Sequence, residues 1–149
     1  MMSIRKMNKS DVETLFDIAL RSFQVDYEKY GVYPPLIKIK QNKFLPPLMF
    51  GRVILVDDRT IGGAFVLALG SKGELGAIFL DPQEQHKGYG KQAMLLIEHA
   101  YPKVRKWKLE TPSDSYGLHR FYEELGYIKA RERVDKKSGM RGFIYEKTV

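Results

Sequence analysis

The chain has 149 residues, enough for one substantial hydrophobic core, and its 44% hydrophobic and 29% charged residues are ordinary for a globular protein. No apolar run reaches the roughly 20 residues of a membrane helix, and zero cysteines exclude disulfides, a thiolate nucleophile and cysteine metal sites. We expect a single domain over residues 1–149, with no secretory signal or membrane partner, in a reducing cytoplasmic compartment.

The formal net charge is +7, from 25 Lys and Arg residues against 18 Asp and Glu residues. Such a balance suits nucleic acid, an acidic partner or a phosphorylated cofactor. The cations cluster modestly at residues 103–108 and 129–137, without zinc-finger spacing, a recognition helix or an aromatic RNA-binding signature. We interpret them as a solvated surface and expect no nucleic-acid partner. A nucleotide-binding or nucleic-acid-binding protein that uses this basic surface remains an alternative.

Hydrophobic periodicity and turn residues divide the first half of the chain into short elements. A helix begins at Ser10, which we interpret as its N-cap because Asp11 and Glu13 follow in the first turn, and its apolar face continues to Phe23. The other expected elements are a strand at residues 3–7, a short helix at residues 36–44, a strand at residues 53–56, a turn at residues 57–60 and a strand at residues 61–69.

The second half alternates strands and helices before a final hairpin. The expected elements are a turn at residues 70–73, strands at 75–80 and 107–110, helices at 88–101 and 116–125, and strands at 127–134 and 142–146 around a turn at 136–139. A strand–helix–strand unit within one sheet pairs its two strands in parallel. Residues 75–110 therefore predict one parallel pair in an otherwise antiparallel sheet, which places the chain in the α/β class.

The most informative segment is residues 80–91, where a strand ends and a helix opens on Gly88 and Gly90. Glycine lets the backbone approach a ligand closely, and the unpaired N–H groups at a helix start form an anion site. Lys87 and Lys91 add positive charge at the same place. The loop can therefore hold a diphosphate.

Two other phosphate-binding motifs fit this loop less well. A Walker A loop fails because Gln85 and Gln92 stand where its first glycine and its hydroxyl residue belong. Residues 88–93 satisfy the dinucleotide fingerprint, and Glu110 follows about 20 residues later. In that fold, however, the first glycine follows its strand almost directly, whereas residues 81–87 intervene here.

The pattern Gln85-x-x-Gly88-x-Gly90 after an apolar strand and Asp-Pro resembles the coenzyme-A-binding motif of the GNAT superfamily of N-acetyltransferases. Residues 121–127 resemble its second block, a helix that ends Tyr-Glu-x-x-Gly-Phe/Tyr, and the resemblance covers roughly residues 75–128. It implies a mostly antiparallel sheet that is splayed at the cofactor site and covered by helices on both faces. It also implies acetyl-CoA as co-substrate and no metal.

The resemblance assigns coenzyme binding to a strand end, the glycine loop and one position downstream. The residues it implies are Ile78, Phe79, Leu80, Gln85, His86, Lys87, Gly88, Tyr89, Gly90, Lys91 and Ser115. The pantetheine arm is expected to pair with the backbone of residues 78–80, with the Leu80 N–H near the thioester carbonyl. Ser115 stands where the family often has Asn, and its hydroxyl can still hydrogen-bond.

Acetyl transfer has three requirements. The acceptor's ammonium group, which titrates near pH ~10.4, must first lose a proton. The oxyanion that forms on the thioester needs a hydrogen-bond donor, and the departing thiolate needs an acid to protonate it. The family pattern makes Tyr122 the acid; the alternative is a tyrosine that packs its helix face with Phe121 and Leu125. Glu110 is the base candidate, because some members that acetylate protein N-termini carry Glu at the matching place. A solvated or ion-paired Glu110, with Glu74 or a water chain as the base, remains an alternative.

The three histidines, His86, His99 and His119, lack metal-ligand spacing, and His119 shares a helix face with Tyr122. The leading hypothesis is an acetyl-CoA-dependent N-acetyltransferase that acts by direct attack of a primary amine on a small molecule or peptide, since no cysteine could carry an intermediate. A non-catalytic coenzyme-binding or regulatory module is the alternative. The identity of the acceptor stays open, and an edge strand near the C-terminus could pair two subunits into a homodimer.

Overall fold

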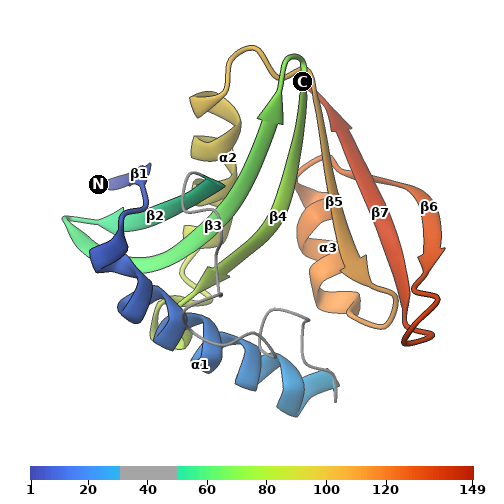
Figure 1. The fold of residues 1–149 in the computed structure, drawn as a ribbon, viewed down its shortest axis with the longest axis horizontal. Coiled ribbons are helices and arrows are strands. Elements are labelled where there is room, and N and C mark those ends of the chain that lie inside the picture. Colours follow the sequence, from blue (N-terminus) through green and yellow to red (C-terminus); the bar gives the residue numbers. More distant parts are fainter. Residues whose placement is uncertain (31–49) are drawn as a thin grey trace. The chain divides into compact units, whose positions relative to one another are not determined.

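The computed structural model describes residues 1–30 and 50–149, whose strands form one sheet in the order β1-β2-β3-β4-β5-β7-β6. The strands are β1 (Met2–Lys6), β2 (Gly51–Val56), β3 (Arg59–Leu69), β4 (Lys72–Leu80), β5 (Lys106–Pro112), β6 (Ile128–Val134) and β7 (Arg141–Thr148). The α-helices of this described part are α1 (Val12–Tyr30), α2 (Tyr89–Ala100) and α3 (Tyr116–Glu124), with 3-10 turns η1 (Lys9–Asp11) and η5 (Pro82–Glu84) (Figure 1).

The sheet is mixed, as the order of elements predicts. β4 and β5 run parallel, and their register joins residues 72–74 to residues 106–108. The registered pairs β1–β2, β2–β3, β5–β7 and β6–β7 are antiparallel. The prediction of an α/β fold with one parallel strand pair is confirmed.

The chain forms two compact units. Unit 1 comprises Met1–Val66 and Ala77–Ala100, and unit 2 comprises Leu67–Gly76 and Tyr101–Val149. β3 and β4 contribute residues to both units. No helix among the described residues is both long enough and apolar enough to cross a membrane.

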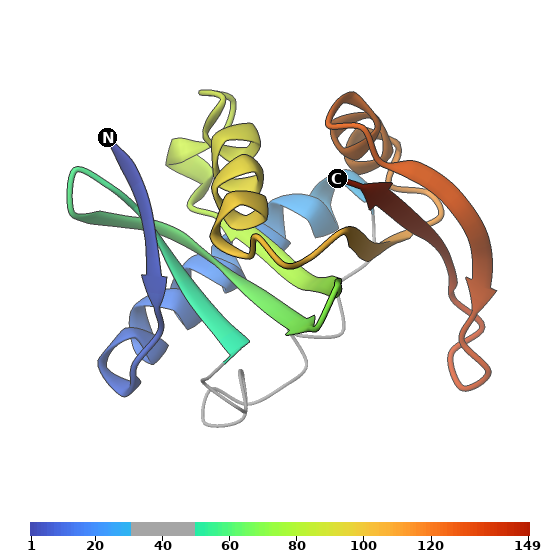
Figure 2. The ribbon, with the colours of Figure 1, turned by 90° about the horizontal axis from the view of Figure 1, so that it is seen from above.

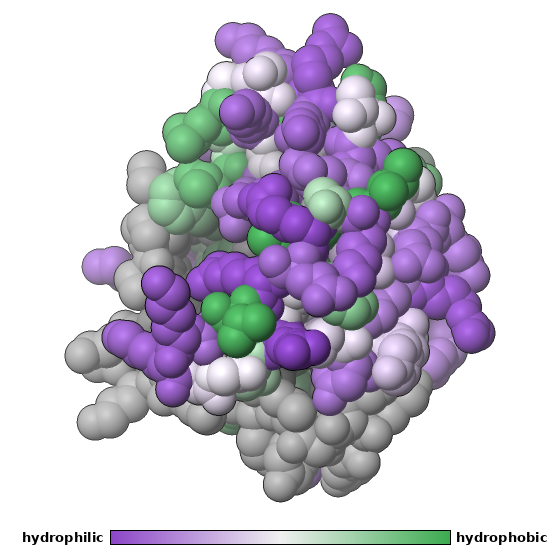
Figure 3. Space-filling view, turned by 90° about the vertical axis from the view of Figure 1, so that its right-hand side faces the viewer, coloured by the Kyte–Doolittle hydropathy of each residue, from purple (hydrophilic) through white to green (hydrophobic). Residues whose placement is uncertain are grey.

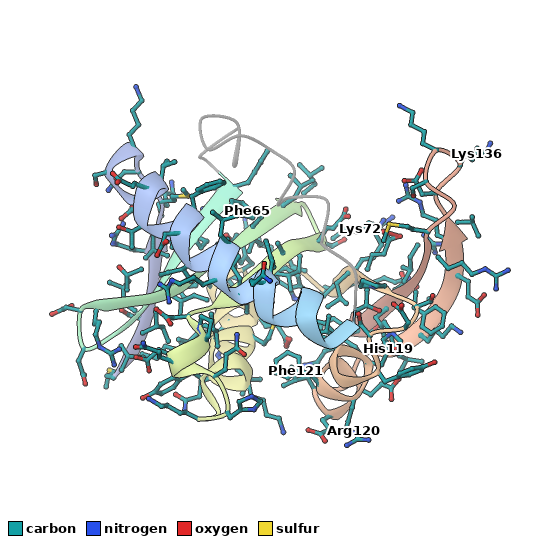
Figure 4. All side chains as sticks on the ribbon, turned by 90° about the horizontal axis from the view of Figure 1, so that it is seen from below. Phe65, Lys72, His119, Arg120, Phe121 and Lys136 are labelled. Carbon is teal, nitrogen blue, oxygen red and sulfur yellow. The ribbon has the colours of Figure 1, made fainter. Side chains whose placement is uncertain are left out.

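In unit 1, α1 covers one face of the strands and α2 covers the other (Figures 1 and 2). Successive residues of β2 alternate between these faces: Val53 and Leu55 join the cluster on the α1 side, and Ile54 joins the cluster on the α2 side. Phe65, labelled in Figure 4, packs against the α1-side cluster. Burial on both faces explains why residues 53–56 form an uninterrupted apolar run.

The predicted N-cap at Ser10 is wrong. Asn8 is the cap: its side chain accepts a hydrogen bond from the Ser10 N–H at 3.0 Å, and the Asp11 carboxylate accepts one from the Asn8 N–H at 2.9 Å. Arg5 of β1 donates two further hydrogen bonds to Asp11, each 2.8 Å long. This capping box places the N-cap two residues before Ser10, and the 3-10 turn η1 begins at Lys9.

Several elements are longer than the periodicity predicts. α1 continues to Tyr30, past the expected end at Phe23, and β3 begins at Arg59 instead of Ile61. The 3-10 turn η5 in the glycine loop has no counterpart among the predicted elements. The short helix expected at residues 36–44 lies outside the described residues.

In unit 2, α3 packs against one face of the strands β5, β7 and β6 (Figure 2). The His119 ring of α3 stacks on Phe143 of β7, with 4.9 Å between ring centroids, and lies 5.8 Å from Tyr145. Leu109 and Thr111 of β5 pair with these two aromatic residues, so they share the α3 side. The alternate residues point the other way. We call this second side the open face; from β5 it carries Lys106, Lys108 and Glu110.

β6 is an edge strand, as the sequence predicts for a strand near the C-terminus. All seven of its residues are exposed, and four of them carry charge. Charged side chains and irregular pairing are the means by which edge strands avoid pairing with another chain. The homodimer contact expected through this edge stays a prediction.

Gly62 of β3 allows a close approach to the end of β4. A Cβ atom at this position would lie 2.2 Å from the Phe79 carbonyl oxygen. Next to it, the Asp81 N–H donates to the Ile61 carbonyl at 2.7 Å, so β3 holds the point where the glycine loop begins.

We expect Gly62→Ala to lower the free energy of unfolding by ~1–3 kcal/mol, because backbone and not a flexible side chain would have to move. Urea denaturation followed by circular dichroism measures this loss. The control is Gly70→Asn: Gly70 has φ +61° with nothing within 4 Å of a Cβ, and Asn tolerates that conformation. Equal losses in the two variants would contradict the prediction.

Candidate functional site

The loop between β4 and α2 has a defined local structure. The Asp81 side chain accepts a hydrogen bond from the Gln83 N–H at 3.0 Å, and Pro82 occupies the first position of η5. His86 (φ 65°) and Gly88 (φ 82°) then adopt the left-handed conformation before α2 begins. Left-handed residues alternating with other conformations bring backbone N–H groups together into anion-binding nests. Two left-handed residues in one short loop are compatible with the anion site that the sequence predicts.

The Gln85 side chain braces the loop from inside. Its Nε2 donates to the Leu80 carbonyl at 3.1 Å and to Ser22 Oγ of α1 at 3.5 Å. The amide is thus occupied with closing the loop onto the end of β4 and onto α1. Any contribution of Gln85 to a bound phosphate would come from its backbone.

The buried carboxylate of Glu84 forms ion pairs with two exposed cations at the loop. It is 7% exposed and accepts hydrogen bonds from Arg59 of β3 and from Lys87 Nζ, the latter at 3.3 Å. The Arg59 hydrogen bond lowers the pKa of Glu84; burial opposes this effect and Lys87 adds to it. The pair with Glu84 keeps Lys87 beside the loop, where the sequence predicts a phosphate-binding cation.

Asp81 ties the loop to α1. Its two carboxylate oxygens accept hydrogen bonds from the Arg21 guanidinium at 2.9 and 3.0 Å, and Arg21 also contacts Asp17 at 3.0 Å. The Arg21 hydrogen bonds lower the pKa of Asp81, against a smaller opposing effect of burial. Sequence reasoning missed Arg21 and Arg59, because their partners lie 60 and 25 residues away and leave no local signal.

The side chains at the end of β4 belong to the core. Phe79 is 3% exposed within the α1-side cluster, whereas Ile78, Leu80 and Tyr89 pack against the α2-side cluster. Phe79 therefore has only its backbone left to hold a ligand, whereas Ile78, Leu80 and Tyr89 are partly exposed. The backbone role of residues 78–80 stays a prediction. At Gly88, by contrast, an added Cβ would meet nothing within 4 Å, so the surface of the loop is open there.

Tyr122 lies on α3 in unit 2 and is 7% exposed. Its ring makes edge contacts with Phe121 at 5.0 Å and with Tyr127 at 5.8 Å. These contacts hold the phenol in one place within an aromatic group. Packing and a chemical role are therefore compatible at this residue.

Glu110 lies on the open face of β5, on the side of the sheet away from α3. Its side chain is 44% exposed, lies 3.6 Å from Arg133 of β6 and packs over Gly142 of β7. Glu74, the other candidate base, also lies on this face in β4, 3.9 Å from Lys108. Both carboxylates are accessible to a substrate on the open face.

Ser115 and His119 form the buried start of α3. Ser115 occupies the N-cap position without a side-chain capping bond, and its N–H donates to the Pro112 carbonyl at 3.2 Å. His119 Nε2 lies 2.8 Å from the same carbonyl; since a carbonyl only accepts, this nitrogen carries the proton. Figure 4 shows His119 turned toward β7 and Arg120 turned away from the strands. His119 shares the buried side of α3 with Tyr122, as its spacing predicts.

The predicted residues are distributed over both units. The strand end at residues 78–80 and the loop at residues 85–91 belong to unit 1, whereas Glu110, Ser115 and Tyr122 belong to unit 2. No group of three or more His, Asp or Glu side chains in the described part of the chain could hold a metal ion.

The Arg21–Asp81 pair predicts a pH dependence. Because the folded-state pKa of Asp81 is lowered, its contribution to stability is present above the ordinary aspartate value near pH ~3.9 and is lost as pH falls through the folded value. Arg21 is 42% exposed, so we expect a contribution of at most about 1 kcal/mol. A double-mutant cycle of Arg21→Ala and Asp81→Asn, measured by urea unfolding at pH 7 and pH 3, should show a larger coupling energy at pH 7 than at pH 3. Equal coupling at both pH values would refute this assignment.

Comparisons with known proteins agree with this fold. The model of the acetyltransferase (GNAT) family matches residues 12–127. The PaiA N-acetyltransferase of Thermoplasma acidophilum, solved in complex with coenzyme A, superimposes with a TM-score of 0.80 at 23% identity, covering 100% of this chain and 99% of that chain. The ribosomal-protein-S18-alanine N-acetyltransferase of Escherichia coli gives 0.72 at 17% identity, covering 100% and 94%. Ard1 of Thermoplasma volcanium gives 0.75 at 16% identity, covering 99% and 97%.

At these identities the structural likeness shows the fold alone, and no curated protein matches the chain. The family model, however, spans most of the sequence, including the glycine loop, both proposed catalytic positions and the helix that carries Tyr122. The chain belongs to the GNAT family of acetyltransferases.

Proposed function

We propose that the protein transfers the acetyl group of acetyl-CoA to a primary amine. The observation that carries this proposal is the loop between β4 and α2, with His86 and Gly88 in the left-handed conformation and cations beside it. Family membership supports acetyl transfer, and the coenzyme A complex of the PaiA protein supports the donor. The zero cysteines fit the reducing cytoplasm that we include in this proposal.

The residues of unit 1 suit a diphosphate followed by an extended arm. The backbone of the loop and the first N–H groups of α2 would hold the diphosphate, with Lys87 and Lys91 beside them. The register between β4 and β5 ends at Glu74, so the backbone of residues 78–80 lies beyond the paired segment. We assign the pantetheine arm to this stretch and the oxyanion donor to the Leu80 N–H.

Bound acetyl-CoA would supply a thioester carbon that a neutral amine can attack. The chain has zero cysteines to accept an acetyl group, so we assign direct attack by the amine. Tyr122 serves as the acid, because a phenol is protonated near pH 7 and this one is held by two aromatic neighbours. Glu110, exposed on the open face, receives the proton of the ammonium directly or through water.

Isothermal titration with acetyl-CoA tests the donor site. We expect saturable micromolar binding by the wild type and a loss of at least ~10-fold in the Gly88→Glu, Gly90→Glu double variant, because the added charges repel phosphate and position 88 becomes strained. Gly139→Glu is the control: Gly139 also has a positive φ, but lies in the β6–β7 turn. No binding by the wild type would remove the proposed donor.

The catalytic assignments are tested by thiol release with a panel of amines. We expect Tyr122→Phe to lower kcat by ~10²-fold or more with unchanged acetyl-CoA affinity, and Glu110→Gln to lower kcat/KM by ~10-fold or more. The controls are Tyr116→Phe, where the side chain is 73% exposed on the same helix, and Glu132→Gln on β6. A Tyr122→Phe enzyme as fast as the wild type would refute the acid role, and binding without turnover of any amine would favour the non-catalytic module.

A further inference from the structure

The fold brings the two basic clusters of the sequence onto one surface of unit 2. Lys106 and Lys108 lie on the open face of β5, and Arg131 and Arg133 lie on β6, with β7 between the two strands. Figure 3 shows the side of the molecule that carries β6, where hydrophilic side chains predominate. The acetyl-transfer chemistry proposed above makes no use of this concentration of charge.

A β-bulge in β6 places its arginines on the open face. Lys129 pairs with Tyr145, on the α3 side, and its Nζ lies 3.6 Å from the centroid of the Phe143 ring. The register then shifts, so that Arg131 pairs with Ile144. Without the extra residue Arg131 would pair with Phe143 and point toward α3, since one step of register exchanges the two faces. The bulge re-aims a cation toward the open face.

The open face is hollowed at this place. A cavity of about 400 Å³ lies here. Apolar residues line part of it, and its charged lining consists of four cations, Lys72, Lys106, Lys108 and Arg131, and two carboxylates, Glu74 and Glu146. All of these belong to unit 2. The volume is that of a small-molecule site.

The charges of the cavity are incompletely balanced. Lys106 pairs with Glu146 at 3.1 Å and Lys108 with Glu74 at 3.9 Å. Within the described residues, neither Lys72 nor Arg131 forms an ion pair with a carboxylate. The cavity therefore holds two uncompensated cations and favours an anionic guest.

The two carboxylates limit the kind of anion that fits. A run of nucleic-acid phosphates would be repelled by Glu74 and Glu146, which line the same hollow, whereas a single anionic group can bind at Lys72 or Arg131. The proposed base lies close by: Glu110 follows Lys108 by two residues on the same face, a distance of about 7 Å along a strand.

We propose that this cavity binds an anionic group of the acceptor, either a carboxylate or a phosphate. We expect this group about 7–14 Å from the acceptor's amine, which corresponds to one or two steps of two residues along β5 from Glu110. The acceptor is then a zwitterionic small molecule or a peptide with an acidic side chain near its amine. The identification of the guest as the acceptor rests on the proposed function. The anion site itself rests on the cavity, the bulge and the uncompensated cations.

The test uses probes that have no free amine, so that transfer cannot intervene. The α-amides of N-acetylglutamate and N-acetyl-O-phosphoserine, each with one anionic group, are titrated into the ¹⁵N-labelled protein, and amide shifts are followed by NMR. Coenzyme A is present to occupy the proposed site at the glycine loop. We expect saturable shifts with millimolar Kd around residues 72 and 131, and none with the uncharged N-acetylglutaminamide. The probe that binds more tightly identifies the carboxylate or the phosphate as the natural group.

Lys72→Ala and Arg131→Ala should each weaken anion binding by at least ~5-fold. Matched controls in unit 2 are Lys136→Ala in the β6–β7 turn and Arg120→Ala on the outer side of α3, both labelled in Figure 4. Equal weakening by the controls, or no saturable binding of either probe to the wild type, overturns the proposal. If acetyl-CoA fails to bind while the anions still bind, the proposed function falls and the anion site stands.

Discussion

The proposed anion site between β4 and α2 depends on backbone N–H groups that the loop must hold open toward a ligand. Two residues in the left-handed conformation create this arrangement, and one of them, His86, is not a glycine. At His86 this conformation costs roughly 1–2 kcal/mol, so the surrounding structure has to enforce it. The enforcement comes from below the loop, through Glu84, Gln85 and Asp81, whose side chains face the protein. The upper side of the loop is thereby left for a ligand.

These braces come from separate parts of unit 1. Asp81 binds Arg21 of α1, Glu84 binds Arg59 of β3, and Gln85 reaches Ser22 of α1. The helix on one face of the sheet and the β2–β3 hairpin are therefore both tied to the loop. A change in the packing of α1 would therefore alter the position of the loop at the proposed phosphate site, even if α1 makes no contact with a ligand.

In unit 2 the two faces of β5 carry different kinds of residue. The residues of β5 that face α3 are apolar or buried and join the aromatic group around His119, whereas the residues between them are charged. Glu110 and the cations of the cavity thus share the open face because they share a parity in sequence. The bulge in β6 shifts the pairing register by one residue and so places Arg131 on the same face. The proposed acceptor site and the proposed base therefore lie on residues whose substitution leaves the core under α3 in place.

The sequence by itself determined the order of elements, the parallel strand pair, the strand–loop–helix motif at Gly88 and the family, because all of these depend on spacings within a few residues of one another. It placed the helix cap at Ser10 in error, because Asn8 and Asp11 form a box that is completed by Arg5 of a neighbouring strand. Only the tertiary structure decided the partners of Arg21 and Arg59 and the side of the sheet on which Arg131 points. Those outcomes depend on register and on contacts between distant segments, and a shift of one residue reverses them.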